Sequence, residues 1–344
     1  MKNRQEQPQV MPNRLTRRHF LGGVGIGVLG GAAFAADCAA TSAEDAAVAP
    51  AYPSEPVANR LRTLIVVGDT QRTTWPERVF LGRKQNDAER AQVLRAIADE
   101  QPDLLLHLGD MVALGEDADD WAYFDTLAAT LRKQNTPVLA LLGNHDYGMW
   151  RHGKRVLHRC YNRFPNTSRR PAVRQVGGMA LVLLDSNFTH LPPWEQTRQQ
   201  QEYLQALRQL DEDPAIGMVV VASHHPPFSN SNLGGDARVE AEFAQPFLDS
   251  KKGRLYLSGH VHSYERFSHG GRTFVVSGGG GGPRRAVSNG ADRAFANDQY
   301  RVGTIRPFHY LRIAVTEHTL RCEVMMLNGS TFECGDQFHV GNEE

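Results

Sequence analysis

Short apolar segments that end in polar clusters are the feature that most constrains the fold of this chain. Each segment is rich in Val, Ile, Leu or Ala, which is typical of a strand buried on both faces. The segments and the clusters that follow them are 61–67 with Gly68-Asp69, 104–108 with Gly109-Asp110, 138–142 with Gly143-Asn144-His145-Asp146, 218–222 with Ser223-His224-His225, and 254–257 with Ser258-Gly259-His260-Val261-His262. The pattern predicts five buried strands whose carboxyl ends carry Asp, Asn and His.

These clusters are expected to meet in one site. In α/β folds, ligands bind where the carboxyl ends of strands meet the following loops. A single Gly-Asp after a strand is commonly only a turn, and Asn144-His145-Asp146 by itself is also explained as a helix cap. Five such clusters, each closing an apolar segment, are much harder to explain as turns.

The side chains in the clusters favour a transition-metal site. Carboxylate and amide oxygens suit hard cations, while imidazole suits borderline ions. A mixed set of Asp, Asn and His therefore suits iron, manganese or zinc better than calcium. Because alternate residues of a strand point to one face, His260 and His262 can both reach one metal cluster.

Patterns elsewhere in the chain indicate an α/β fold. Helices are predicted over 87–100, 117–134 and 195–210. The other strand patterns are 181–184, 272–276, 309–315, 320–327 and 331–340. Early alternation of strands and helices followed by a strand-rich third predicts a four-layer α-β-β-α sandwich. Its two mixed β-sheets pack together, and the metal site lies at the C-terminal ends of the strands.

The first residues resemble an export signal. Arg17-Arg18 precedes a Gly-rich apolar stretch over 21–36 that contains Ala33-Phe34-Ala35, as in a bacterial twin-arginine signal with its cleavage site. We therefore predict a signal peptide over 1–36, a disordered linker over 37–59 and a catalytic domain over 60–344. A transmembrane anchor is the alternative, but the stretch is short and rich in Gly. The mature protein is expected in the periplasm or outside the cell, without a stable membrane span.

The balance of charges argues against nucleic acid as a partner. The chain has 38 basic and 38 acidic residues, so it lacks the basic footprint of a nucleic-acid binder. An anionic substrate must then be attracted by the local site, through its metal, and not by the overall field.

The order D-x-[HQ], GD, GNHD, H and GHxH over residues 64–282 resembles the calcineurin-like metallophosphoesterase superfamily. Gly259–Arg266 and the Gly-rich run Gly278–Gly282 are similar to the purple acid phosphatase branch. The resemblance implies a dinuclear phosphoester hydrolase that acts on a small phosphorylated substrate, most simply a phosphomonoesterase that uses metal-bound hydroxide. The alternatives are a phosphodiesterase of cyclic nucleotides or lipid head groups and a non-catalytic metal- or phosphate-binding protein.

The same resemblance assigns roles residue by residue. Asp69, Asp110 and His262 would hold the first metal, and Asn144, His224 and His260 the second, with Asp110 bridging the two. His145 would lie beside the phosphate as a hydrogen-bond donor or general acid, so His145 and Asp110 are the predicted catalytic residues. Arg72, Arg266, Arg284 and Arg285 are candidate phosphate clamps, because Arg can donate bidentately.

Two positions depart from the family pattern. The purple enzymes have Tyr where this chain has Ala113, and other relatives have an Asp that supports the catalytic His, which an Ala side chain cannot do. Gln71 stands where many relatives have His, and its amide oxygen is predicted to ligate the first metal directly or through water. His225 is expected either to support the site or to serve packing.

The cysteines leave one structural question open. Cys322 and Cys334 lie symmetrically about Asn328, at the predicted Asn328-Gly329-Ser330 turn. They are therefore expected either to form a disulfide across the hairpin or to be two buried thiols. Cys160 is predicted to be a small core residue of a helix.

Overall fold

The computed structural model describes residues 51–54, 61–148, 154–167, 170–316 and 319–341. By its internal contacts the chain divides into Met1–Ala47 and Val48–Glu344, and every element described below belongs to the second unit. The predicted signal peptide lies outside the described residues, as does most of the predicted linker. None of the described helices has the length and apolar character needed to cross a membrane.

The first sheet has six strands in the order β12-β11-β10-β1-β2-β3. The strands are β1 (Thr63–Val67), β2 (Leu104–His107), β3 (Val138–Ala140), β10 (His309–Val315), β11 (Thr319–Asn328) and β12 (Thr331–Gly341). β1 pairs in parallel with β2 and antiparallel with β10, with Leu64 opposite Leu104 and Ile313. The sheet is therefore mixed, and the polar clusters after β1, β2 and β3 leave it at one edge.

The second sheet also has six strands, in the order β4-β5-β6-β7-β9-β8. The strands are β4 (Ala172–Val176), β5 (Met179–Leu183), β6 (Met218–Ala222), β7 (Gly253–Ser258), β8 (Tyr264–His269) and β9 (Arg272–Ser277). Strands β5, β6, β7 and β9 run in parallel, while β4 and β8 are antiparallel edge strands. Because the central strands of this sheet are parallel, the loops after β6 and β7 lie at a common edge.

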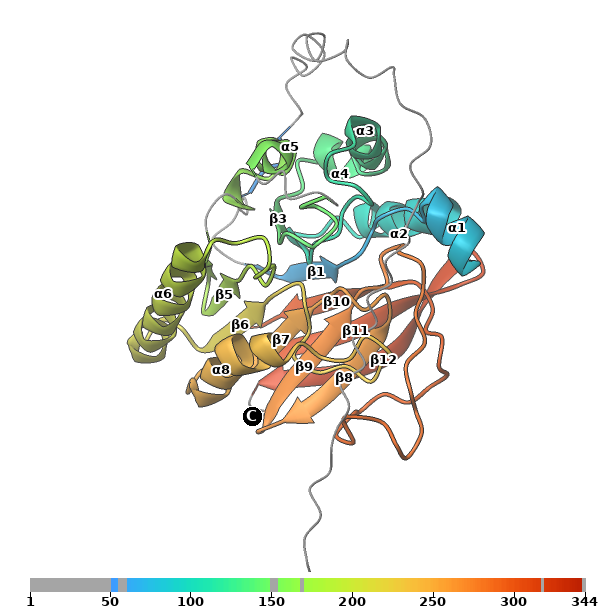
Figure 1. Ribbon diagram of the computed structural model, residues 1–344. Helices are drawn as coiled ribbons and strands as arrows, with labels where there is room; N and C mark the ends of the chain where they lie inside the picture. The colour runs from blue at the N-terminus through green and yellow to red at the C-terminus, as the bar shows by residue number, and fades with distance from the viewer. Residues whose placement is uncertain (1–50, 55–60, 149–153, 168–169, 317–318, 342–344) are drawn as a thin grey trace, which may run out of the picture. The chain divides into compact units, whose positions relative to one another are not determined.

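The two sheets pack on each other, and helices cover their outer faces (Figure 1). The helices are α1 (Trp75–Leu81), α2 (Asp87–Asp99), α3 (Ala118–Leu127), α4 (Ala129–Lys133), α5 (Lys154–Arg163), α6 (Pro193–Glu212), α7 (Ala237–Val239) and α8 (Gln245–Asp249). Leu64 of β1 belongs to the core between the sheets, whereas Ile65 packs with Ile97 of α2 on the outer face. Strand alternation thus explains why these strands are apolar on both sides. The predicted four-layer sandwich is confirmed.

Local differences from the predicted elements have local causes. The helix predicted over 117–134 is two helices, α3 and α4, and the Asp117 side chain caps the first by accepting from the N–H groups of Asp119 and Asp120. The strands β4 and β8 and helix α1 were not predicted, because each is short and carries charged residues, so that it lacks the continuous apolar run of the predicted strands.

The predicted linker differs from the structure where residues 51–54 are described. Tyr52 is buried, its ring stacks on Phe164 at 5.0 Å, and its N–H donates to the carbonyl of Arg163. The Pro53 carbonyl accepts from the N–H of Val138. This segment therefore belongs to the folded unit, upstream of the predicted boundary at residue 60.

The hairpin between β11 and β12 excludes the predicted pair of cysteines. Asn328 pairs with Thr331, and a bulge between Val324 and Met325 shifts the register, so that Cys322 faces Phe338 and Cys334 faces Met325. Cys322 is buried and Cys334 is exposed, and both are free thiols. The symmetry about Asn328 was wrong because the turn is centred between Gly329 and Ser330. Cys160 is a buried core residue of α5, as predicted.

Candidate metal centre

The loops after β1 and β2 hold two carboxylates in a strained backbone conformation. Asp69 has φ 60° and Asp110 has φ 55°, and His260 after β7 has φ 66°. Residues other than Gly seldom adopt positive φ, and such strain concentrates at functional sites. Both carboxylates are buried. The fold therefore tolerates backbone strain at these two residues, and this conformation directs their side chains toward the edge shared by the two sheets.

Asp146 ties the loop after β2 to the loop after β3. Its buried carboxylate accepts from the main-chain N–H groups of Asp110, Met111 and Gly143 at 2.8–2.9 Å. A Cβ at position 143 would clash with the Asp110 carboxylate, which explains the glycine there. Sequence reasoning placed Asp146 in the cluster but did not assign it this positioning role.

One group of acceptor atoms converges between Asp69, His262 and Gln71. The Nδ1 atom of His262 lies 2.9 Å from the carbonyl of Pro283, which can only accept, so the neutral ring presents its Nε2 lone pair. That Nε2 atom lies 3.4 Å from Oδ1 of Asp69, and Oδ1 has no hydrogen-bond partner among the described residues. The side-chain amide of Gln71 lies 2.9 Å from the same Nε2 atom.

A second group of acceptor atoms lies around His224. Its Nδ1 atom is 2.9 Å from the carbonyl of Leu108, so the Nε2 atom points into the site. Nε2 lies 3.3 Å from both Oδ1 of Asn144 and Oδ2 of Asp110. Asn144 Oδ1 is also 3.0 Å from Nδ1 of His260.

Asp110 stands between the two groups. Its Oδ2 atom is 3.3 Å from Nε2 of His224 and 3.4 Å from the side-chain amide of Gln71. The structure therefore brings the predicted ligands together in the two groups that the family resemblance implies. Their roles as ligands stay predictions.

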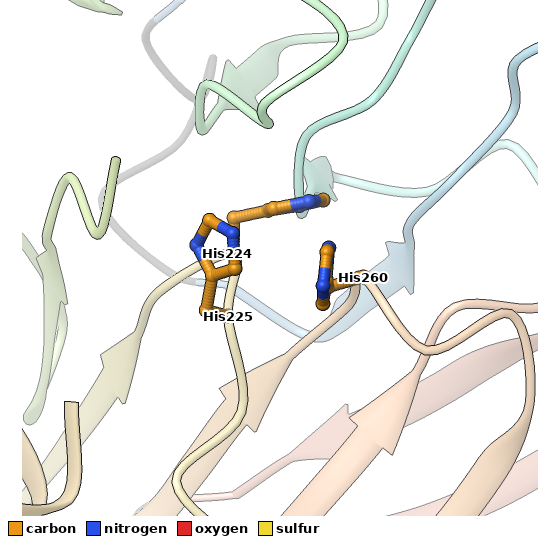
Figure 2. A group of neighbouring side chains, drawn as sticks. All are labelled: His224, His225 and His260. Atoms are coloured by element: carbon orange, nitrogen blue, oxygen red, sulfur yellow. The ribbon is translucent and has the colours of Figure 1, made fainter. Parts of the chain in front are cut away.

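His225 joins the site as a residue that was not assigned as a ligand. Figure 2 shows His224, His225 and His260 gathered at the ends of the neighbouring strands β6 and β7. One nitrogen from each ring lies within 4.8 Å of the others. The Ser186 hydroxyl is 2.8 Å from Nδ1 of His225 and fixes that ring. Strict strand alternation would send two adjacent histidines to opposite faces, but the chain has already left β6 at Ser223.

His145 is held by the main chain of the loop after β2. Its Nδ1 atom lies 2.8 Å from the carbonyl of Ala113, and its N–H donates to Oδ1 of Asp110 at 2.8 Å. The expectation that Ala113 leaves this histidine unsupported concerned the side chain only. The backbone carbonyl of Ala113 supports the imidazole ring through Nδ1. The Nε2 atom of His145 makes no bond to Ala113.

Burial and opposite charges set the ionisation of the site. Burial raises the pKa of Asp69 to about 8. Burial also favours the neutral form of Asp110, but the facing imidazoles of His224 and His145 outweigh it and hold the pKa of Asp110 below its usual range. Burial acts to lower the pKa of His224, yet Asp110 raises it to about 10. Buried carboxylates of this kind are costly unless a cation compensates them.

The donor set fits metal ions. Side-chain oxygen and nitrogen atoms lie 3.3–3.4 Å apart around Asp69 and His224, and Oδ1 of Asp69 has no partner among the described residues. A cation at such a convergence would take these atoms as ligands, and His224 and His262 each have their other nitrogen fixed by a backbone carbonyl, as is usual for metal ligands. Mixed carboxylate, amide and imidazole ligation suits transition ions.

The four candidate arginines separate into two kinds. Arg72 pairs with Asp117 and Asp120, and Arg266 pairs with Asp336, so both are engaged in ion pairs. Arg284 is exposed and lies over the ring of Phe308. The main-chain N–H of Arg285 donates to the carbonyl of His262. The Arg285 guanidinium interacts electrostatically with Asp69, and its Nε atom is buried without a partner among the described residues.

Comparison with known families agrees with this geometry. The profile of the calcineurin-like phosphoesterases matches residues 62–264, which is more than half of the chain and includes every predicted metal ligand. The protein belongs to the calcineurin-like phosphoesterase family. No curated protein matches the sequence significantly.

Solved structures share the fold of this calcineurin-like phosphoesterase at low sequence identity. A purple acid phosphatase from yellow lupin (Lupinus luteus) seeds has 14% identity and a TM-score of 0.62, and the match covers 84% of this chain and 54% of that one. This chain thus spans about half of the lupin enzyme. GAP50, the anchor in the inner membrane complex of Plasmodium, has 12% identity and a TM-score of 0.60 over 83% and 90% of the two chains. A dimetal phosphatase from Danio rerio has 13% identity and a TM-score of 0.55 over 82% and 99%.

Proposed function

We propose that this protein is a dinuclear-metal phosphoester hydrolase that acts on phosphomonoesters. The observation that carries the proposal is the pair of converging acceptor groups with Asp110 between them. Asp69, Gln71 and His262 would hold one ion, and Asn144, His224 and His260 the other. Iron, manganese or zinc would supply Lewis acidity and lower the pKa of a bound water.

The chain's own groups would bind and orient the phosphate. The Nε2 atom of His145 is left to face substrate because Nδ1 is bound to the Ala113 carbonyl. Against the effect of burial, Asp110 and the Ala113 carbonyl raise the pKa of His145 above its usual value, and the protonated ring donates from Nε2 to a phosphate oxygen or to the leaving oxygen. Arg285 is the candidate clamp for a phosphate oxygen, since its main-chain N–H donates to the carbonyl of His262 and its buried Nε has no partner among the described residues.

A non-catalytic role is the second candidate. The Plasmodium neighbour of the same fold is described as an anchor, so the fold is compatible with binding functions. Gln71, a neutral ligand where relatives have His, weakens the first metal group. Such a protein would bind metal or phosphate tightly without turnover.

The purified protein should be loaded with manganese, zinc or iron and assayed on p-nitrophenyl phosphate and bis(p-nitrophenyl) phosphate. We expect the monoester to be cleaved faster. Faster cleavage of the diester would favour a phosphodiesterase, and metal binding without turnover of either ester would favour the non-catalytic role. Removal of the metal with a chelator should abolish turnover.

We also propose that the protein is exported through the twin-arginine route. The proposal rests on Arg17-Arg18 and the apolar stretch behind it, which lie outside the described residues. Changing both arginines to lysine should retain the protein in the cytoplasm of a bacterial host. Unchanged export of that double variant would contradict the proposal.

A further inference from the structure

A cavity of about 450 Å³ opens between α5 and the start of α6. Its walls include Tyr147, Leu157, Tyr161, His190, Leu191 and Trp194. We propose that this cavity binds the alcohol part of the phosphoester and selects a flat, uncharged aromatic group. The inference rests on the proposed phosphoesterase function and names the substrate class for that site.

The cavity adjoins the loops that carry His145 and His225. Tyr147 lines the cavity and lies on the same loop as His145, and its ring stacks on His190 with centroids 4.7 Å apart and planes 19° apart. Asp185 also lines the cavity, and the hydroxyl of its neighbour Ser186 lies 2.8 Å from Nδ1 of His225. The His225 ring in turn lies 4.4 Å from the ring of His260. The leaving group of a phosphate held at the metal centre therefore has aromatic surface beside it.

The charged groups at the base of the cavity are used within the fold. The Asp185 carboxylate accepts from the hydroxyl of Tyr147 and from the backbone and side-chain N–H groups of Asn187. Arg170 donates to the carbonyls of Asn166 and Ala140 at 2.9 and 2.6 Å. These two buried groups carry opposite charges, and the third charged residue of the lining, Glu195, lies 3.6 Å from the guanidinium of Arg198. The lining therefore gives the cavity no preference for a second charged group on the ligand.

Size and wall chemistry favour an aromatic ligand. Pockets for small organic ligands have volumes of about 300–1,000 Å³ and are mostly apolar, and the cavity lies in that range. Aromatic walls stack on flat rings. Trp194 is 62% exposed at the first turn of α6, so its indole stands at the mouth, where it can cover a bound ring.

The test compares two esters whose leaving groups have similar reactivity. Metal-loaded full-length protein is assayed on 2-(1-naphthyl)ethyl phosphate and on ethyl phosphate. We expect kcat/KM for the naphthyl ester to be higher by about 10-fold to 100-fold, because the ring is buried only in the first case. Trp194→Ala should reduce this ratio at least about threefold.

Trp75→Ala is the matched control. Trp75 is 63% exposed, against 62% for Trp194, and it does not line the cavity. Both indoles can be removed without opening the core, so folding is not at stake. A ratio near one in the unaltered protein, or equal effects of the two substitutions, would overturn the inference while the proposed function stands.

A binding measurement separates the two proposals. 2-(1-Naphthyl)ethanol carries the ring without the phosphate, and its binding is followed by calorimetry on the unaltered protein and on Trp194→Ala. We expect binding that the substitution weakens. If the alcohol binds in this way but no ester is cleaved with any metal, the proposed function fails and the pocket remains. If the alcohol does not bind, the pocket assignment is wrong.

Discussion

The main-chain N–H of His260 donates to Oδ2 of Asp69 at 2.9 Å, across 191 residues of sequence. Asp69 follows β1 of the first sheet and His260 follows β7 of the second. A Cβ at Gly259 would approach the same carboxylate oxygen to 2.5 Å, so a glycine is needed for the two loops to meet. Together with the contact of His224 Nδ1 with the Leu108 carbonyl, this hydrogen bond joins the two sheets at the candidate metal centre, and it leaves the other oxygen of Asp69 to face His262.

Asp69→Asn should remove metal and activity but keep the fold. The Asn oxygen can still accept from His260, whereas the amide nitrogen replaces the oxygen that faces His262. We expect less than full metal occupancy by elemental analysis and a loss in kcat/KM of at least about 100-fold. Asp292→Asn, at an exposed carboxylate, is the control. Full occupancy and activity in Asp69→Asn would refute the ligand assignment.

Gln71 should determine how firmly the first metal is held. It is buried beside His262 and Asp110. Gln71→Glu adds a charged oxygen ligand of the same size, so we expect tighter metal binding in a competition with a coloured chelator. Gln71→Ala should weaken binding by about tenfold or more. If neither substitution changes the metal affinity, Gln71 is not part of the metal site.

Arg285 should contribute to phosphate binding, and its neighbour should not. Arg285→Ala is expected to raise KM for p-nitrophenyl phosphate about tenfold, because a charge-assisted donor is lost. It should weaken inhibition by inorganic phosphate by a similar factor. Arg284→Ala serves as the control, since that side chain is exposed and lies over Phe308. Equal effects of the two substitutions would point to a general effect of charge and not to a clamp.

Glu265 should make the stability of the fold depend on pH. Burial raises its pKa from 4.5 to about 7, against the hydrogen bonds from Ser229 and Asn230. The folded state therefore binds this proton more tightly than the unfolded chain. Its stabilisation is full below about pH 4.5 and is lost as the pH rises through 7, by at most ~3 kcal/mol.

Glu265→Gln tests this dependence, because the amide keeps both hydrogen-bonding partners and does not titrate. In urea unfolding at pH 5 and pH 8, the unaltered protein should lose more stability between the two pH values than the variant does. Glu240→Gln, at an exposed position, is the control and should follow the unaltered protein. An identical pH dependence in Glu265→Gln would show that this carboxyl is ionised throughout.

The hairpin of β11 and β12 illustrates where sequence reasoning stopped. Both strands were predicted from their patterns, but the facing residues depend on the centre of the turn and on the bulge at Val324 and Met325. A shift of one position moves every cross-strand pair. The predicted meeting of Cys322 and Cys334 failed for that reason, although each strand was placed correctly.

The support of His145 shows a second kind of limit. A side chain at position 113 is visible in the sequence, and Ala113 offers none that can hold an imidazole. Every residue has a carbonyl, however, so the sequence does not mark which one will accept a hydrogen bond. Only the path of the loop after β2 brings the Ala113 carbonyl within 2.8 Å of His145.

The sequence by itself determined the strands, the polar residues that follow them and the kind of chemistry that those residues can perform. These properties are local, since apolar runs form buried strands and Asp, Asn and His carry their ligand atoms wherever they lie. Tertiary structure decided how the loops of the two sheets meet, how Asp110 stands between two groups of acceptors, and that His225 joins them. It also decided the aromatic cavity beside α6. Those features depend on contacts between distant segments, which packing of the whole domain sets and no local pattern records.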